Sequence, residues 1–219
     1  MKNLNWLKIL LFAVSVGLAV YFYPKLPAEV PSHWNAQGEV DGHAPKFWGL
    51  FLIPIIMIVL SGIFALIPQI DPLKNNISQF RKHYDRFVIV LLIFLLFVQA
   101  QIIVVGLGHN DAPNKLLPIG LGMFFYFVGI LCLHSKRNWF VGIRTPWTLS
   151  SDIVWEKTNT LGGNLFKISG ILIFLSSWAT SFSGFVLAAP LIVTALVSVV
   201  YSYVIFKKVG ASNLSEDVK

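Results

Sequence analysis

The chain alternates long apolar runs with short polar segments. Five apolar runs stand out, at residues 4–23, 47–70, 87–108, 116–133 and 168–206. A helix needs about 20 apolar residues to cross the hydrocarbon core of a bilayer. The fifth run is long enough for two crossings, and the polar stretch 180–184 divides it. The pattern therefore predicts an all-α integral membrane protein with six transmembrane helices.

Composition excludes an ordinary soluble domain. The chain has 219 residues, of which 56% are apolar and 12% are charged, and its mean hydropathy is +0.72. Soluble domains carry about 25% charged residues. With half that share, polar side chains cannot cover a water-facing surface. The lipid bilayer is therefore the first predicted partner.

Positive charges fall unevenly on the two sides of the predicted bundle. If the N-terminus is cytoplasmic, fourteen of the 17 Lys and Arg residues lie in inner segments, and the outer segments hold Lys25, Lys46 and Lys115. Such an excess marks the cytoplasmic side. We therefore expect both termini in the cytoplasm and a multi-pass protein of the inner (plasma) membrane. Because the basic residues serve topology and form no single patch, no direct nucleic-acid partner is predicted.

The first apolar run has an alternative interpretation as a cleaved signal peptide. Its basic start and apolar core fit that interpretation, but cleavage needs small residues after the core. The aromatic stretch Tyr21-Phe22-Tyr23-Pro24 stands there instead. The run is therefore treated as a retained span.

The connections divide the chain into three predicted parts. Residues 1–70 form a two-span region with an outer loop, residues 24–46. Residues 71–206 form a four-span region with a cytoplasmic loop, residues 135–166. Residues 207–219 form a polar, mobile cytoplasmic tail.

The outer loop is expected to be compact. Its prolines favour extended backbone at the start, and Gly38 and Gly42 permit tight turns with positive φ. Four side chains in it form a candidate metal set: His33, Glu39, Asp41 and His43. Their spacing matches no zinc pattern. The favoured interpretation is a turn stabilised by hydrogen bonds, with no metal and no cofactor.

The cytoplasmic loop holds three tryptophans, Trp139, Trp147 and Trp155, within 17 residues. Indole rings favour the headgroup level, so these residues predict an interfacial segment. Ser150 is a candidate N-cap of a short helix that ends at the pair Gly162-Gly163. Arg144 is a candidate ligand for a lipid phosphate, a helix C-terminus or a carboxylate. The alternative is that this loop only anchors the bundle.

The predicted spans contain few groups suited to transport. No Asp, Glu, Lys or Arg falls in the middle of any predicted span, whereas ion-coupled transporters usually carry one there. The polar residues within the spans more often join helices than line a pathway, and they are Gln99, Gln101, Ser176, Ser177 and Thr180. A transporter is therefore disfavoured.

Both loops resemble one protein family. The run from Arg137 to Ser150, with Trp155 and Gly162-Gly163 after it, resembles the signature of SdpI-like immunity proteins; its site residues are Asn138, Gly142, Arg144, Thr145, Pro146, Trp147, Ser150 and Trp155. The outer loop resembles the uncharacterised domain that often precedes the immunity domain, through Leu26-Pro27, Pro31, His33, Gly38, Asp41-Gly42 and Lys46. His43 follows in the same loop. The two resemblances cover residues 10 to 205, nearly the whole chain.

The resemblance implies a non-enzymatic membrane immunity or signalling protein that protects the cell from a secreted antimicrobial peptide. The toxic peptide is the implied partner. In the best-known member a cytoplasmic transcriptional repressor is held at the membrane as well, which makes a repressor an optional second partner here. Two other function classes stay open. One is a small peptide or lipid transporter, and the other is a membrane enzyme with a metal in the outer loop.

Overall fold

The computed structural model describes residues 2–109, 112–178 and 184–216. Its helices are α1 (Lys2–Phe22), α2 (Lys46–Ile70), α3 (Lys74–Gln79), α4 (Arg81–Gly106), α5 (Ala112–His134), α6 (Pro146–Ser150), α7 (Asp152–Leu175) and α8 (Gly184–Glu216). A 3-10 turn, Ser176–Trp178, follows α7, and the strands are β1 (Glu29–Trp34) and β2 (Val40–Pro45). Six helices are long and apolar enough to cross a membrane. The prediction of a six-span helical membrane protein is confirmed.

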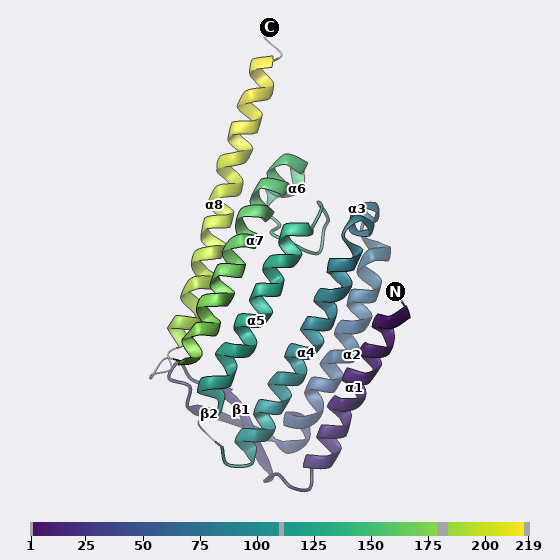
Figure 1. Cartoon of the computed structure of the whole chain (residues 1–219), viewed down its shortest axis with the longest axis vertical. Coiled ribbons are helices and arrows are strands. Elements are labelled where there is room, and N and C mark those ends of the chain that lie inside the picture. The colour runs from purple at the N-terminus through teal and green to yellow at the C-terminus, as the bar shows by residue number, and fades with distance from the viewer. Residues whose placement is uncertain (1, 110–111, 179–183, 217–219) are drawn as a thin grey trace.

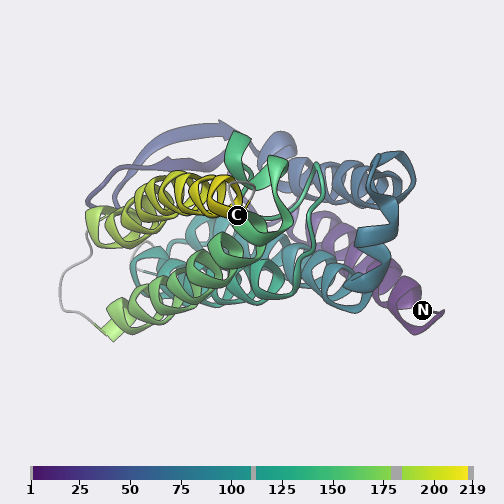
Figure 2. The same cartoon turned by 90° about the horizontal axis from the view of Figure 1, so that it is seen from above.

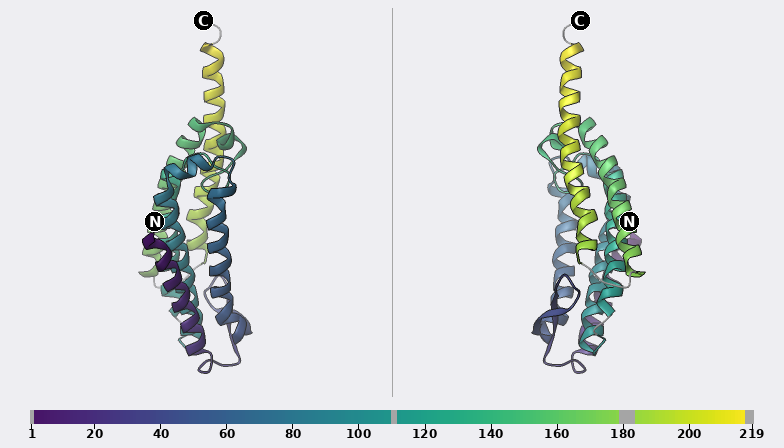
Figure 3. Two further views of the ribbon diagram at one scale, coloured as in Figure 1. Left: turned by 90° about the vertical axis from the view of Figure 1, so that its right-hand side faces the viewer. Right: turned by 90° about the vertical axis from the view of Figure 1, so that its left-hand side faces the viewer.

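The long helices lie side by side in the order α8, α7, α5, α4, α2, α1 (Figure 1). Seen from above, α2 and α8 lie apart, on the two sides of the segment that joins α5 to α7 (Figure 2). Helix α8 packs on α7 and α6, whereas α2 packs on α1, α3, α4 and the strands. The strands lie at one end of the bundle, and both termini point toward the end that carries α3 and α6 (Figure 3).

A buried polar cluster joins α1, α2 and α4. The Gln99 side chain is fully buried. Its Nε2 donates to the carbonyl oxygens of Ser15 (3.0 Å) and Leu50 (3.1 Å), and its Oε1 accepts from the Ser15 hydroxyl at 2.6 Å. Hydrogen bonds between membrane helices stabilise by about 0.6 kcal/mol each on average. The predicted role of Gln99 in joining helices is confirmed.

Helices α5 and α7 cross with their backbones almost touching. A Cβ added to Gly170 would lie 2.6 Å from the carbonyl oxygen of Gly122, and one added to Gly163 would lie 2.8 Å from that of Gly129. The prediction that a short helix ends at Gly162-Gly163 is therefore wrong, because α7 runs through that pair without interruption. These glycines are needed for close helix approach, which is common in membranes.

The span containing Lys167 also differs from the prediction. Because α7 begins at Asp152, Lys167 lies well inside a membrane-spanning helix and not at its start. Its Nζ lies 5.4 Å from the ring centroid of Tyr126 on α5. The statement that no charged residue lies in the middle of a span is therefore wrong for this lysine. An aromatic ring supplies part of the stabilisation that lipid cannot.

The outer loop forms an antiparallel hairpin, which the sequence pattern did not predict. The turn is closed by Asn35, whose Oδ1 accepts from the backbone N–H groups of Gln37 and Glu39 at 2.9 Å each. Gly38 has a φ of 78°, as predicted, but Gly42 lies in β2 without a positive φ. A Cβ on Gly42 would lie 2.9 Å from that of His33, so its role is close strand approach at a bulge.

The hairpin packs against the membrane helices through Val30. Val30 is fully buried and belongs to a cluster that includes Leu50 of α2 and Ile102 of α4. At its tip, the carbonyl oxygen of Ala36 accepts from the backbone N–H of Gly184 at 2.6 Å. The hairpin thereby reaches from α2 to the start of α8.

Two further predictions concern the ends of α8. The predicted turn at 180–184 falls largely outside the described residues. The predicted tail is helical through Glu216, since α8 continues past the last apolar residues.

Single cysteines test the predicted orientation. In a Cys132→Ser background, which removes the buried natural thiol, Gln37→Cys should react with a membrane-impermeant maleimide in intact cells, and Ser212→Cys should not. The exposed hairpin position 37 lies at the end opposite both termini. Reaction at position 212 before lysis would overturn the cytoplasmic placement of the termini.

Candidate functional site

The segment between α5 and α7, residues 135–151, is named the signature loop here. It contains α6 and lies at the end of the bundle that also carries α3. The predicted cytoplasmic loop 135–166 is shorter in the structure, because residues 152–166 belong to α7. The predicted N-cap is also off by one residue. Ser151 caps α7 by accepting from the backbone N–H of Val154, while the Ser150 hydroxyl donates to the carbonyl of Trp147.

Asn138 organises the first half of the signature loop. Its side chain is fully buried. The Oδ1 accepts from the N–H groups of Phe140 (2.9 Å) and Val141 (2.7 Å), and the Nδ2 donates to the carbonyls of Lys136 and Val141, each at 2.8 Å. One amide thus satisfies four backbone groups, as Asn can when both its ends are used.

Asp71, directly after α2, and Asn76 of α3 hold the signature loop from the side. Asp71 is buried, and its Oδ2 accepts from the backbone N–H of Trp139 at 2.9 Å. Asn76 donates from Nδ2 to the carbonyl of Arg137 at 2.8 Å. The sequence interpretation missed both residues. Asp71 could have been noticed because its carboxylate directly follows an apolar span.

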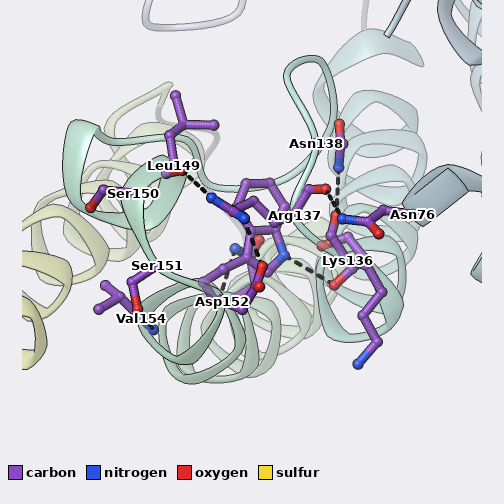
Figure 4. Close-up of polar contacts among 12 residues, drawn as sticks. Asn76, Lys136, Arg137, Asn138, Leu149, Ser150, Ser151, Asp152 and Val154 are labelled. Carbon is purple, nitrogen blue, oxygen red and sulfur yellow. Dashed lines mark hydrogen bonds and ion pairs between the residues drawn. The ribbon is translucent and has the colours of Figure 1, made fainter. Parts of the chain in front are cut away.

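Arg137 fastens the loop to the start of α7 (Figure 4). Its Nε donates to Asp152 Oδ1 at 2.7 Å, and its Nη1 donates to the carbonyl of Leu149 at 2.9 Å. The carboxylate is exposed, so the backbone contact matters more than the ion pair.

Gly142 passes over α7 in a conformation that requires glycine. Its φ is 109°, and a Cβ there would lie 2.8 Å from Asn159 Oδ1 and 3.0 Å from the Trp155 ring. Trp155 itself is buried, and its Nε1 donates to the carbonyl of Ser135 at 3.0 Å. Trp155 therefore does not present an exposed ring to the lipid headgroups. Its indole supports the loop from beneath.

Thr145 and Pro146 begin α6 and attach it to α8. Thr145 forms a capping box with Thr148, and Pro146 occupies the first turn, where its missing N–H costs nothing. The Thr145 hydroxyl also donates to Ser202 Oγ on α8 at 3.0 Å. Trp147 packs on Tyr203 of α8, with 5.1 Å between ring centroids.

Arg144 is an exposed charged residue of the signature loop. Its Nη1 donates to the carbonyl of Trp139 at 2.5 Å. None of the ion pairs found among the described residues involves Arg144. A guanidinium has five N–H donors, so donors are left for a ligand. Trp139 is half-exposed beside it.

A cavity of about 450 Å³ lies directly beneath the loop. Phe64 of α2 lines one side of the cavity, and Ala195 and Val199 of α8 line the other. The remaining lining residues are Phe87, Val128, Leu131, Cys132, Phe140, Val141, Gly142, Ile143, Arg144, Thr145, Phe166 and Ser198. Because Ala195 and Val199 are exposed, the cavity opens sideways between α2 and α8. We call this opening the lateral window. Arg144 is the one charged residue among its described lining residues.

The outer site residues lie at the opposite end of the molecule. His33 Nδ1 and Asp41 Oδ1 are 2.5 Å apart on the exposed hairpin, and His43 pairs in register with Pro31. Among residues 2–109, 112–178 and 184–216, no group of three His, Cys, Asp or Glu side chains is placed to hold a metal. The structure therefore brings together the residues of the signature loop but does not join them to the hairpin set.

Comparison with known proteins gives the same two regions. Residues 134–202 match the SdpI/YfhL protein family, and residues 10–58 match a domain of unknown function, DUF1648. The chain is similar to the immunity protein SdpI of Bacillus subtilis (strain 168), with 25% identity over 209 residues, which cover 95% of this chain and 98% of that protein. No solved structure matches the chain. The resemblance to the SdpI-like family is thus confirmed: this membrane protein carries the SdpI/YfhL family region at residues 134–202, preceded by a DUF1648 domain.

Proposed function

We propose that this protein protects the membrane that contains it from a secreted toxic peptide, and that protection depends on the signature loop. The observation that carries the proposal is that some residues of the loop and of α7 beneath it fix the loop's shape, while another is exposed at the surface. Asn138, Gly142 and Trp155 are turned inward and fix its shape, whereas Arg144 is left at the surface. A binding site needs such a preorganised support. The similarity to an immunity protein over nearly the whole chain supports the same role.

The site suits recognition more than catalysis. The Asn138 amide is engaged with backbone groups of the same loop, and Arg144 lines the cavity with donors left for a ligand. A membrane-active peptide offers backbone or terminal carbonyl oxygens, which match a guanidinium at the surface of the loop. The proposal is therefore for a non-catalytic protein, and it leaves the repressor role aside.

The test is survival under the toxin of cells that express single variants. Arg144→Lys and Trp147→Ala should each abolish protection while the protein accumulates normally in membrane fractions. Lysine keeps the charge but cannot reproduce the planar, two-pronged contact of arginine. Alanine removes the packing of Trp147 on Tyr203.

The resemblance counts Ser150 among the site residues, but its exposed hydroxyl donates only to the carbonyl of Trp147 in its own helical turn, so Ser150→Ala is the matched control. It should protect like the wild type. Full protection by Arg144→Lys would reduce the loop to a membrane anchor and contradict the proposal. A transporter, by contrast, would also lose protection when its energy coupling is removed.

A further inference from the structure

We infer that the cavity beneath the signature loop binds one acyl chain of an anionic phospholipid of the adjacent leaflet, and that Arg144 binds the phosphate of the same molecule. The inference goes beyond protection from a toxin, and it rests on the cavity and on Arg144.

The position of the cavity matches the place of a lipid chain. Phe64 lies six residues before the end of α2, and Leu131 three residues before the end of α5. At about 1.5 Å per residue, Phe64 and Leu131 lie within roughly 10 Å of the ends of their helices. The acyl chains of one leaflet occupy this depth. A chain can enter sideways, because the lateral window separates α2 from α8.

The chemistry of the cavity also matches. Apart from Arg144, its described lining is apolar except for Thr145 and Ser198 and the thiol of Cys132. The hydroxyls of Thr145 and Ser198 already donate to Ser202 Oγ and to the carbonyl of Thr194. The interior therefore offers its surface to a hydrocarbon and not to a peptide backbone, whose polar groups would stay unpaired there.

The charge at the mouth selects the headgroup. Arg144 is exposed at the membrane boundary beside Trp139 and Phe140, which are exposed aromatic residues of the kind found at headgroup level. Arg144 takes part in none of the ion pairs of the described residues, and Asp152 and Asp85 are bound by Arg137 and Arg81. An anionic phosphate complements this guanidinium without competition from a carboxylate.

The experiment is native mass spectrometry of the purified full chain in detergent, with phosphatidylglycerol or phosphatidylcholine of identical acyl chains added back. The wild type should retain one phosphatidylglycerol and prefer it about fivefold, the factor expected for one basic residue near a charged lipid. Arg144→Gln should remove the preference. Ala195→Phe, which fills the exposed side of the cavity, should remove retention of both lipids.

Leu196→Phe is the matched control, because Leu196 is an exposed neighbour on α8 outside the cavity lining. It should retain lipid like the wild type. Equal retention of the two lipids by the wild type, or an unchanged preference in Arg144→Gln, would overturn the inference. Because Arg144 is exposed, Arg144→Gln should fold. The comparison of wild type with Arg144→Gln therefore tests the inference even if Ala195→Phe does not fold. Because no toxin is present, failure here is distinct from failure of the protection assay.

Discussion

Replacing Asn138 with aspartate should unfold the signature loop although the side chain keeps its shape. The carboxylate would face the carbonyls of Lys136 and Val141, to which Nδ2 now donates at 2.8 Å, in a fully buried position. Each buried group left without its partner costs about 1–3 kcal/mol, and a buried charge costs more. Protection should be lost as a consequence.

Limited digestion by trypsin measures this effect, since the loop contains Lys136, Arg137 and Arg144. Cleavage at these sites in purified Asn138→Asp protein should be roughly tenfold faster or more, because cleavage follows the population of the open loop. Ser150→Ala should be cut at the wild-type rate. Slow, wild-type cleavage of Asn138→Asp would show that the amide does not support the loop.

Gly170→Ala should strongly destabilise the packing of the membrane helices. The added Cβ would lie 2.6 Å from both the carbonyl oxygen of Gly122 and the backbone nitrogen of Tyr126. Backbone atoms of a neighbouring helix cannot rotate away, so α5 and α7 must separate. Overpacking of this kind costs about 1–3 kcal/mol and sometimes more, which lowers the unfolding temperature by roughly 2–4 °C per kcal/mol.

Gly62→Ala is the control for this prediction, because a Cβ there would meet nothing within 4 Å. Alanine favours helices over glycine by about 1 kcal/mol in water, so Gly62→Ala should leave the unfolding temperature unchanged or raise it. Thermal unfolding of both variants in the same detergent gives the comparison. Equal unfolding temperatures would mean that the α5–α7 crossing tolerates a wider spacing.

The number of spans could be predicted from sequence because lipid requires about 20 apolar residues per crossing. That requirement does not fix what each residue of a span or loop does. Trp155 fits an interfacial tryptophan by type, but its indole is used for a buried hydrogen bond to Ser135. Gly162 and Gly163 fit a helix end by type, but Gly163 is needed because α5 passes against it, and Gly162 lies against Ile143 of the signature loop. Both outcomes depend on residues far away in the sequence.

The site could be predicted as a segment but not as a set of contacts. The resemblance singled out Asn138, Gly142 and Thr145, and the structure gives each a structural task. It could not show Asp71, which lies 68 residues before the backbone group that it binds. The hairpin was missed for a related reason. The register of its strands includes bulges, and the hairpin packs on Leu50. Its sequence has no alternation of apolar and polar residues that would predict strands.

At each end of the bundle, contacts join the α2 side of the lateral window to α8. On one face of the bundle, Ala36 of the hairpin accepts a hydrogen bond from Gly184 at the start of α8. On the other face, Asp71 at the end of α2 binds the loop that Thr145 attaches to α8. The same two helices are therefore connected at both ends of the bundle. A molecule that separates the hairpin from α8 would also change the spacing that the signature loop spans at the opposite end.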